Sequence, residues 1–100
     1  MAVLAVFRAK GFTKQMYNDL IEVVDWEKVK PGGAIVHVCA FDENGDICVS
    51  DVWESEAHLN EFVENHLIPT MRRLDIPQPQ ATIYPLHNME VTKAVEKYVL

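Results

Sequence analysis

The fold of this protein is decided by one stretch of its sequence, residues 34–53, which reads AIVHVCAFDENGDICVSDVW. Two β-rich runs flank a polar segment, which predicts a β-hairpin. The strands are expected at Ala34–Phe41 and Ile47–Trp53. Asp42 at the first turn position and Gly45 at the fourth suit a type I turn followed by a glycine bulge, a three-residue loop.

The length of this loop decides which residues of the two strands face each other. With three loop residues, Asp42 pairs with Asp46 and His37 lies directly across from Asp51. A two-residue Asn-Gly loop would shift the pairing by one residue and reverse the faces of one strand. The turn chemistry favours the three-residue loop.

The elements around the hairpin are predicted from the spacing of apolar residues and from the capping, proline and glycine residues that begin and end helices. A strand at Ala2–Arg8 precedes a helix capped by Thr13, which Pro31-Gly32-Gly33 ends. Ser55 caps a second helix, which Pro69 should break or kink. The apolar faces of the two helices are formed by Met16, Tyr17, Leu20, Ile21, Val23 and Val24, and by Leu59, Phe62, Val63, His66 and Leu67.

The remaining elements complete one α+β domain, residues 1–100. An extended linker at 76–79 leads to a strand at 81–87, and the tail, 88–100, is expected to form a short helix. The order of strand, helix, strand, strand, helix and strand predicts a ferredoxin-like split βαβ fold with a four-stranded antiparallel sheet.

This sheet has more apolar surface than two helices can cover. The first strand is apolar on both sides, and Ala34–Phe41 alternates small residues with larger ones. The small residues suit packing under the helices, so the larger ones (Ile35, His37, Cys39 and Phe41) are expected on the bare face. Because monomers rarely expose apolar patches of more than a few hundred Å², we expect a homodimer through that face.

Composition limits the classes of function. The chain has 15 acidic and 9 basic residues and a net charge of -6, which disfavours nucleic-acid binding. No apolar run approaches the ~20 residues that span a bilayer, so we expect no membrane contact and a cytoplasmic location. Cys39 and Cys48 are expected to be buried small residues rather than a disulfide, and no histidine spacing indicates a metal site.

Residues 52–57, VWESEA, followed by Phe62, and the strand with His37 resemble the dimeric α/β-barrel superfamily over residues 2–87. That superfamily includes antibiotic-biosynthesis monooxygenases, haem-degrading monooxygenases and stress-responsive barrel proteins. The resemblance implies a pocket beside the sheet and oxidation of a small aromatic substrate by dioxygen with no cofactor. Haem-degrading members have an Asn on the first strand and a His about ten residues after the Trp. This chain has Arg8 and no Asn on that strand, and Val63 stands ten residues after Trp53, so their pattern is not matched.

The candidate catalytic residues are His37 and Asp51. A carboxylate in an apolar strand face needs a partner, and the facing imidazole supplies one. Together they form a general acid–base dyad in an apolar pocket. The alternative is a structural pair that holds the hairpin register or the dimer.

The candidate ligand-binding residues are Trp53, Phe41, His66 and His87. Trp53 and Phe41 are expected to form walls of the pocket, or else to be core side chains. His66 is either a core histidine bonded to a carbonyl or a group at the pocket mouth. His87 is placed at the barrel rim, or simply ends its strand. Three functions remain open: a monooxygenase, a non-catalytic or stress-related ligand-binding dimer, and a purely structural dimer.

Overall fold

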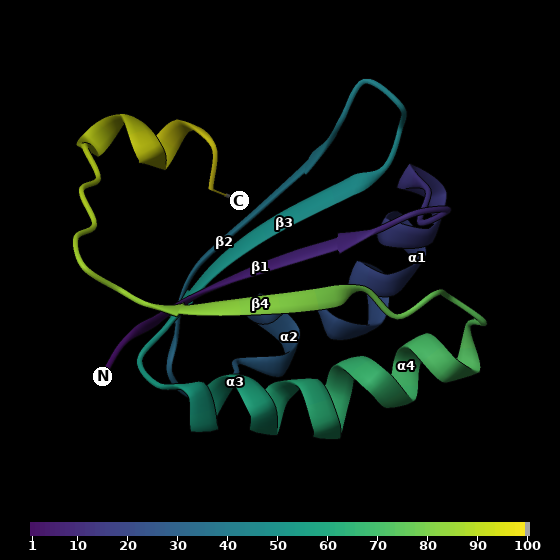
Figure 1. The fold of residues 1–100 in the computed structure, drawn as a ribbon, viewed down its shortest axis with the longest axis horizontal. Helices are drawn as coiled ribbons and strands as arrows, with labels where there is room; N and C mark the ends of the chain where they lie inside the picture. The colour runs from purple at the N-terminus through teal and green to yellow at the C-terminus, as the bar shows by residue number, and fades with distance from the viewer. Residues whose placement is uncertain (100) are drawn as a thin grey trace.

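The computed structural model describes residues 1–99 and has the ferredoxin-like α+β fold that the sequence predicts (Figure 1). Within these residues, four antiparallel strands form one sheet in the order β2-β3-β1-β4, and the α-helices pack on one face of it. The strands are β1 (Val3–Ala9), β2 (Ala34–Phe41), β3 (Ile47–Trp53) and β4 (Gln80–Pro85). The helices are α1 (Lys14–Val24), α2 (Trp26–Val29), α3 (Glu56–Phe62), the π-turn η1 (Val63–Leu67), α4 (Ile68–Arg73) and the 3₁₀ helix η2 (Lys93–Lys97).

The β2–β3 hairpin has the predicted three-residue loop. The Gly45 N–H donates to the Asp42 carbonyl at 2.9 Å, and Gly45 takes the left-handed φ of 82° that the glycine bulge requires. The Asp42 N–H donates to the Asp46 carbonyl at 2.8 Å, so these residues pair. His37 consequently faces Asp51, as predicted.

One irregularity interrupts the hairpin near its open end. Ala34 pairs with Trp53 and Val36 pairs with Val52, so Ile35 is an extra residue in a β-bulge. The bulge carries Ala34 to the helix side of the sheet, where it packs against the core.

The assignment of the sheet faces by residue size was wrong. His37, Cys39 and Phe41 point toward the helices, and the small residues of β2 point away from them. The physical reason is that the large side chains Tyr17 of α1 and Trp26 of α2 contact the larger side chains of β2. Large residues on both layers fill the space between sheet and helices, so small size on β2 does not mark the covered face.

The face opposite the helices, here called the open face, is nevertheless largely apolar. The strand pairing shows which side chains lie on this face: a set of apolar residues, together with Ser50, Thr82, Cys48 and Arg8. The apolar set is Leu4, Val6, Val36, Val38, Ala40, Val52 and Tyr84. Val38 and Tyr84 are each more than half exposed, so the expected surplus of apolar sheet surface exists. It is formed by the small residues of β2 and not by the larger ones.

The second helix is not broken at Pro69. The chain from Glu56 to Arg73 is one continuous rod, because the wider turn η1 lies just before the proline (Figure 1). The Ile68 N–H donates to the Val63 carbonyl five residues earlier. A proline ring clashes with the carbonyl four residues before it in a regular helix, and the π-turn removes that clash. The predicted N-cap is confirmed, since the Ser55 hydroxyl accepts from the His58 N–H at 3.1 Å.

The first helical segment divides in two. Thr13 caps α1 as predicted, accepting from the Met16 N–H at 3.2 Å. Asp25 then interrupts the helix, and its carboxylate accepts from the Glu27 N–H at the start of α2. This break brings Trp26 over the sheet, next to His37. No helix in residues 1–99 is long and apolar enough to cross a bilayer.

Candidate functional site

A chain of hydrogen bonds joins four side chains between the helices and the sheet. The Tyr17 hydroxyl of α1 lies 2.7 Å from Nε2 of His37, and Nδ1 of His37 lies 2.7 Å from a carboxylate oxygen of Asp51. The other carboxylate oxygen of Asp51 accepts from the indole N–H of Trp53 at 3.2 Å. We call Tyr17, His37, Asp51 and Trp53 the relay.

The hairpin register and α1 together position the relay. His37 and Asp51 face each other across β2 and β3, and Trp53 lies two residues beyond Asp51 on the same face. Tyr17 reaches them from the helix above. Trp53 was expected to be a pocket wall or a core residue, and its side chain is fully buried in the core cluster.

The relay can hold or pass one proton without moving a side chain. In the neutral ring, Nδ1–H of His37 donates to Asp51 and Nε2 accepts from the Tyr17 hydroxyl. In the imidazolium ring, Nε2–H donates to the Tyr17 oxygen instead. Asp51 is buried, whereas the His37 side chain is 29% exposed, so the end of the relay at His37 and Tyr17 is the one that solvent can reach.

Burial keeps the acidic groups at this end in their neutral forms. It raises the pKa of Tyr17 well above its usual value, and the neighbouring Cys39 and the Asp51 carboxylate act in the same direction. Burial also raises the pKa of the Cys39 thiol. Tyr17 therefore remains a phenol at ordinary pH and serves as the donor to His37.

Aromatic side chains enclose the relay. Trp26 lies against His37 with ring centroids 5.3 Å apart and meets Trp53 edge-on at the same distance. Tyr17 is parallel to His37 and meets Phe41 edge-on at 6.3 Å. Phe41 is half-buried and contacts the relay through Tyr17 rather than through His37. The sequence-based search missed Tyr17 and Trp26 as site residues, because Tyr17 was counted only as part of an apolar helix face and Trp26 in no site.

A second feature is an apolar cavity of about 120 Å³ between the helical rod and the β4–β1 half of the sheet. Apolar side chains dominate its lining, with Asn60 and Gln78 as its polar members. The main apolar residues are Phe7, Leu59, Val63, Leu67, Met71 and Ile83. An apolar cavity of about 150 Å³ can bind benzene, and this one, at about 120 Å³, is smaller and suits a small apolar group. No relay residue lines it.

Two predicted ligand-binding residues lie outside both features. His66 is exposed on the π-turn, with its ring tilted against Phe62 at 5.8 Å, so the core interpretation was wrong. It is not among the residues that line the cavity. His87 is exposed beyond the end of β4. Within residues 1–99 no group of three or more His, Cys, Asp or Glu side chains is arranged to hold a metal ion.

Solved structures with this fold support the resemblance that the sequence suggested. A protein from Deinococcus radiodurans described as a candidate antibiotic biosynthesis monooxygenase superposes with a TM-score of 0.59 at 11% identity, over 92% of this chain and 98% of that one. A protein of the same description from Chloroflexus aurantiacus J-10-fl has a TM-score of 0.59 at 13% identity, over 92% and 100%. A conserved protein from Methanosarcina mazei Go1 has a TM-score of 0.64 at 17% identity, over 84% and 91%.

These matches identify a class of fold. The chain has the α/β fold found in proteins described as candidate antibiotic biosynthesis monooxygenases, which confirms the predicted resemblance at the level of structure. No family model matches the sequence, and no curated protein matches it significantly. Identities of 11–17% establish the shared fold and no specific activity.

Proposed function

We propose that this protein is a cofactor-independent monooxygenase of small, electron-rich aromatic compounds. The observation that carries the proposal is the relay, in which the Tyr17 hydroxyl, the His37 ring and the buried Asp51 carboxylate are joined by contacts of 2.7 Å. The fold shared with proteins described as candidate monooxygenases supports the same reaction class.

The reaction needs a base and draws its electrons from the substrate. An activated aromatic CH₂ group loses a proton to the relay and reduces dioxygen. One oxygen atom enters the ring as a carbonyl, and the other leaves as water with the two hydrogens of the CH₂ group. No electron is required from a metal or a flavin.

The residues of the relay divide this work. Tyr17 accepts the substrate proton on its oxygen while its own proton passes to Nε2 of His37. Asp51 stabilises the imidazolium that forms and holds the ring in one orientation. The reverse transfer delivers the proton to the reduced oxygen.

Binding without catalysis is the second candidate function, and the apolar cavity favours it. The cavity is lined by core residues and by no group of the relay, so a small apolar ligand there would not contact the base. In either case the partner of the chain is a second copy of itself, because the apolar open face is left uncovered by the helices.

Oxygen uptake with a panel of anthrones and polyhydroxylated aromatics tests the enzymatic proposal. His37→Ala and Tyr17→Phe should each lower turnover by about 10²–10⁴-fold, the usual contribution of general acid–base catalysis. Tyr84→Phe is the matched control, because it removes the same hydroxyl from a half-exposed tyrosine on the open face. Turnover unchanged in both relay variants would remove the relay from the reaction. Saturable binding of the aromatics without any oxygen uptake would instead support the second candidate.

A further inference from the structure

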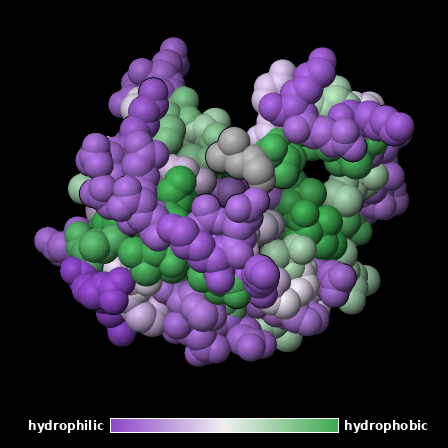
Figure 2. All heavy atoms as spheres, turned by 180° about the vertical axis from the view of Figure 1, so that it is seen from behind, coloured by the Kyte–Doolittle hydropathy of each residue, from purple (hydrophilic) through white to green (hydrophobic). Residues whose placement is uncertain are grey.

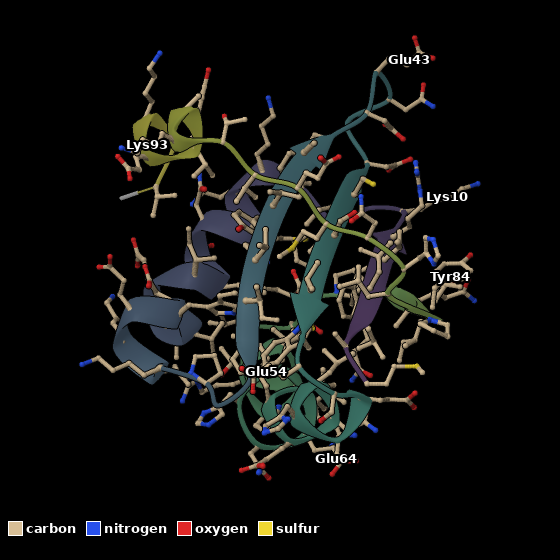
Figure 3. The ribbon with its side chains drawn as sticks, turned by 90° about the vertical axis from the view of Figure 1, so that its left-hand side faces the viewer. Lys10, Glu43, Glu54, Glu64, Tyr84 and Lys93 are labelled. Atoms are coloured by element: carbon tan, nitrogen blue, oxygen red, sulfur yellow. The ribbon has the colours of Figure 1, made fainter. Side chains whose placement is uncertain are left out.

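Tyr17 differs from the other two tyrosines of the chain in having a base beside its hydroxyl. Within residues 1–99 it is the tyrosine whose hydroxyl has a hydrogen-bond partner, Nε2 of His37 at 2.7 Å. Tyr84 is 51% exposed and Tyr98 is 83% exposed. Figure 3 shows Tyr84 on β4, at the sheet edge opposite to the β2 edge, beside which α1 and α2 lie.

A base at this place decides how easily the phenol loses an electron. A phenol that keeps its proton after losing an electron becomes a radical cation, which is a strong acid and a product of high energy. Water accepts this proton poorly, whereas an imidazole already in hydrogen-bond contact accepts it readily. Burial raises the pKa of Tyr17, so the proton does not leave before the electron at neutral pH. The electron and the proton of Tyr17 must therefore leave together.

The rest of the relay stabilises the transferred proton. His37 with a proton on both ring nitrogens is an imidazolium, and the Asp51 carboxylate 2.7 Å from Nδ1 stabilises this cation. Asp51 is buried, so water screens its charge only weakly. The proton therefore stays in hydrogen-bond contact with the Tyr17 oxygen and can return to it when the electron is replaced.

Aromatic contacts connect Tyr17 both to the core and to the surface. The Trp26 ring centroid lies 5.3 Å from the ring centroids of His37 and of the fully buried Trp53. The Tyr17 ring is parallel to the His37 ring at 6.1 Å. Tyr17 and Trp26 are both half-buried, and Figure 2, which views the side of α1 and α2, shows apolar side chains among the polar ones at the surface. An oxidised tryptophan can therefore draw an electron from Tyr17, and solutes can exchange electrons with Tyr17 from solution.

We propose that Tyr17 is a redox-active tyrosine, which gives one electron to oxygen-derived radicals of the peroxyl class while His37 accepts its proton. The O–H bond of Tyr17 breaks and an Nε2–H bond forms on His37, which leaves a neutral tyrosyl radical. The peroxyl radical takes the electron, and the peroxide anion so formed takes a proton from water to give the hydroperoxide. Ascorbate in solution then returns one electron to Tyr17 and releases its own proton to water, and the phenolic proton goes back from His37.

This role goes beyond the oxygenase activity and does not depend on it, because no aromatic substrate takes part. It also gives the aromatic contacts a purpose, since an electron from Tyr17 repairs an oxidised Trp26 or Trp53 before the indole reacts irreversibly.

Flash oxidation of the full chain by photogenerated ruthenium(III) tris-bipyridine, under nitrogen and without any aromatic substrate, gives the first test. The double variant Tyr84→Phe/Tyr98→Phe retains Tyr17 as its only tyrosine. It should form a neutral tyrosyl radical in the same yield as the wild type, read from the absorption band and the EPR spectrum. Tyr17→Phe should lose most of this signal, although both exposed tyrosines remain. A yield that Tyr17→Phe leaves unchanged, or a wild type without a tyrosyl radical, would overturn the proposal whether or not the chain is an oxygenase.

The rate of radical formation tests whether His37 takes the proton. In the double variant, His37→Ala should slow radical formation by about 10²-fold, the lower end of what a positioned base contributes. Added imidazole should restore the rate, and deuterium oxide should slow the reaction of the wild type. His58→Ala removes an exposed imidazole on α3 and is the matched control, with an unchanged rate. A rate that His37→Ala leaves unchanged, or that stays low with imidazole in a variant shown to be folded by circular dichroism, would refute the role of His37.

Exposure to peroxyl radicals from an azo initiator tests the reaction with oxygen-derived radicals. Tryptophan fluorescence should be lost faster in Tyr17→Phe than in the wild type, because the tryptophans are no longer repaired. Tyr84→Phe removes a hydroxyl from the open face and should behave like the wild type. Equal losses in the two variants would contradict the reduction of peroxyl damage by Tyr17.

Discussion

In the described part of the chain, the two ring N–H groups that donate to the Asp51 carboxylate have no other hydrogen-bond partner, so removing this carboxylate should cost stability in a calculable way. Within residues 1–99, Nδ1 of His37 and Nε1 of Trp53 both direct their hydrogens at Asp51. A buried donor left unpaired costs about 1–3 kcal/mol. The fully buried indole of Trp53 should cost about 2 kcal/mol, and His37, whose side chain is 29% exposed, about 1 kcal/mol because water can reach it.

Asp51→Ala should therefore lower the free energy of unfolding by about 2–4 kcal/mol, a large part of the 5–15 kcal/mol typical of a small domain. Urea unfolding followed by circular dichroism measures it, with a midpoint about 1 M or more below that of the wild type and an unchanged m-value. A double-mutant cycle with Trp53→Phe should give a coupling energy of about 0.5–3 kcal/mol. A loss below about 0.5 kcal/mol would refute the view that Asp51 holds these two donors.

Asp51→Asn separates geometry from charge. Its amide oxygen can accept from Trp53, but its NH₂ group then faces Nδ1 of His37. The neutral ring must carry its proton on Nε2 and donate to the Tyr17 oxygen, which reverses the relay. We expect a smaller loss, about 1 kcal/mol, with a reversal of the His37 tautomer in ¹⁵N NMR spectra. An unchanged tautomer would contradict the hydrogen-bond assignment.

Three further predictions follow from single positions. The pKa of Tyr17 is raised above its ordinary 10.0, so the folded state binds the phenolic proton more tightly than the unfolded state does. The free energy of unfolding should therefore be constant below pH 10 and fall as the pH rises above it. Tyr17→Phe should reduce this fall, as measured by urea titrations at several pH values. Asp75 has a left-handed φ of 56° at the end of α4, so Asp75→Gly should raise stability by about 0.5–1 kcal/mol, measured as a higher melting temperature. Gly33→Ala should lower the free energy of unfolding by more than about 2 kcal/mol, because Gly33 has a φ of 80° and the new methyl group would overlap the His58 side chain. Gly11→Ala places its methyl group in open space, so it should lower the free energy of unfolding only by the backbone strain of about 1–2 kcal/mol. Equal losses for the two glycine variants would refute the packing argument.

The elements that could be predicted from the sequence are those with local causes. The three-residue loop follows from Asp42 and Gly45 alone, and once the loop is known the pairing of His37 with Asp51 follows by counting along the strands. The helix caps at Thr13 and Ser55 are equally local, since a hydroxyl satisfies the N–H three residues later. The fold class then follows from the order of elements.

The error over the sheet faces concerns an interaction between distant segments, whereas the error at Pro69 is local. Residue size along β2 did not show which face the helices cover, because the answer depends on the bulk of Tyr17 and Trp26 in the facing layer. Pro69 was expected to break or kink its helix, and the π-turn before it accommodates the ring without a break. The burial of Asp51 is a better criterion for the faces than residue size. A buried carboxylate needs hydrogen-bond donors, and the side of the sheet that carries Asp51, His37 and Trp53 is the side from which Tyr17 reaches His37.

The inverted faces change how the two proposed functions relate to each other. A site on the open face would exist only in the dimer, so loss of association would abolish binding and catalysis together. The relay instead lies under α1 and α2 of its own subunit, where Trp26 and Tyr17 exclude water from Asp51 without help from a partner. The proposed proton transfer and the proposed self-association therefore involve opposite faces of one sheet. A chain held as a monomer by a charge on the open face should retain the relay geometry, because no hydrogen bond of the relay crosses the sheet.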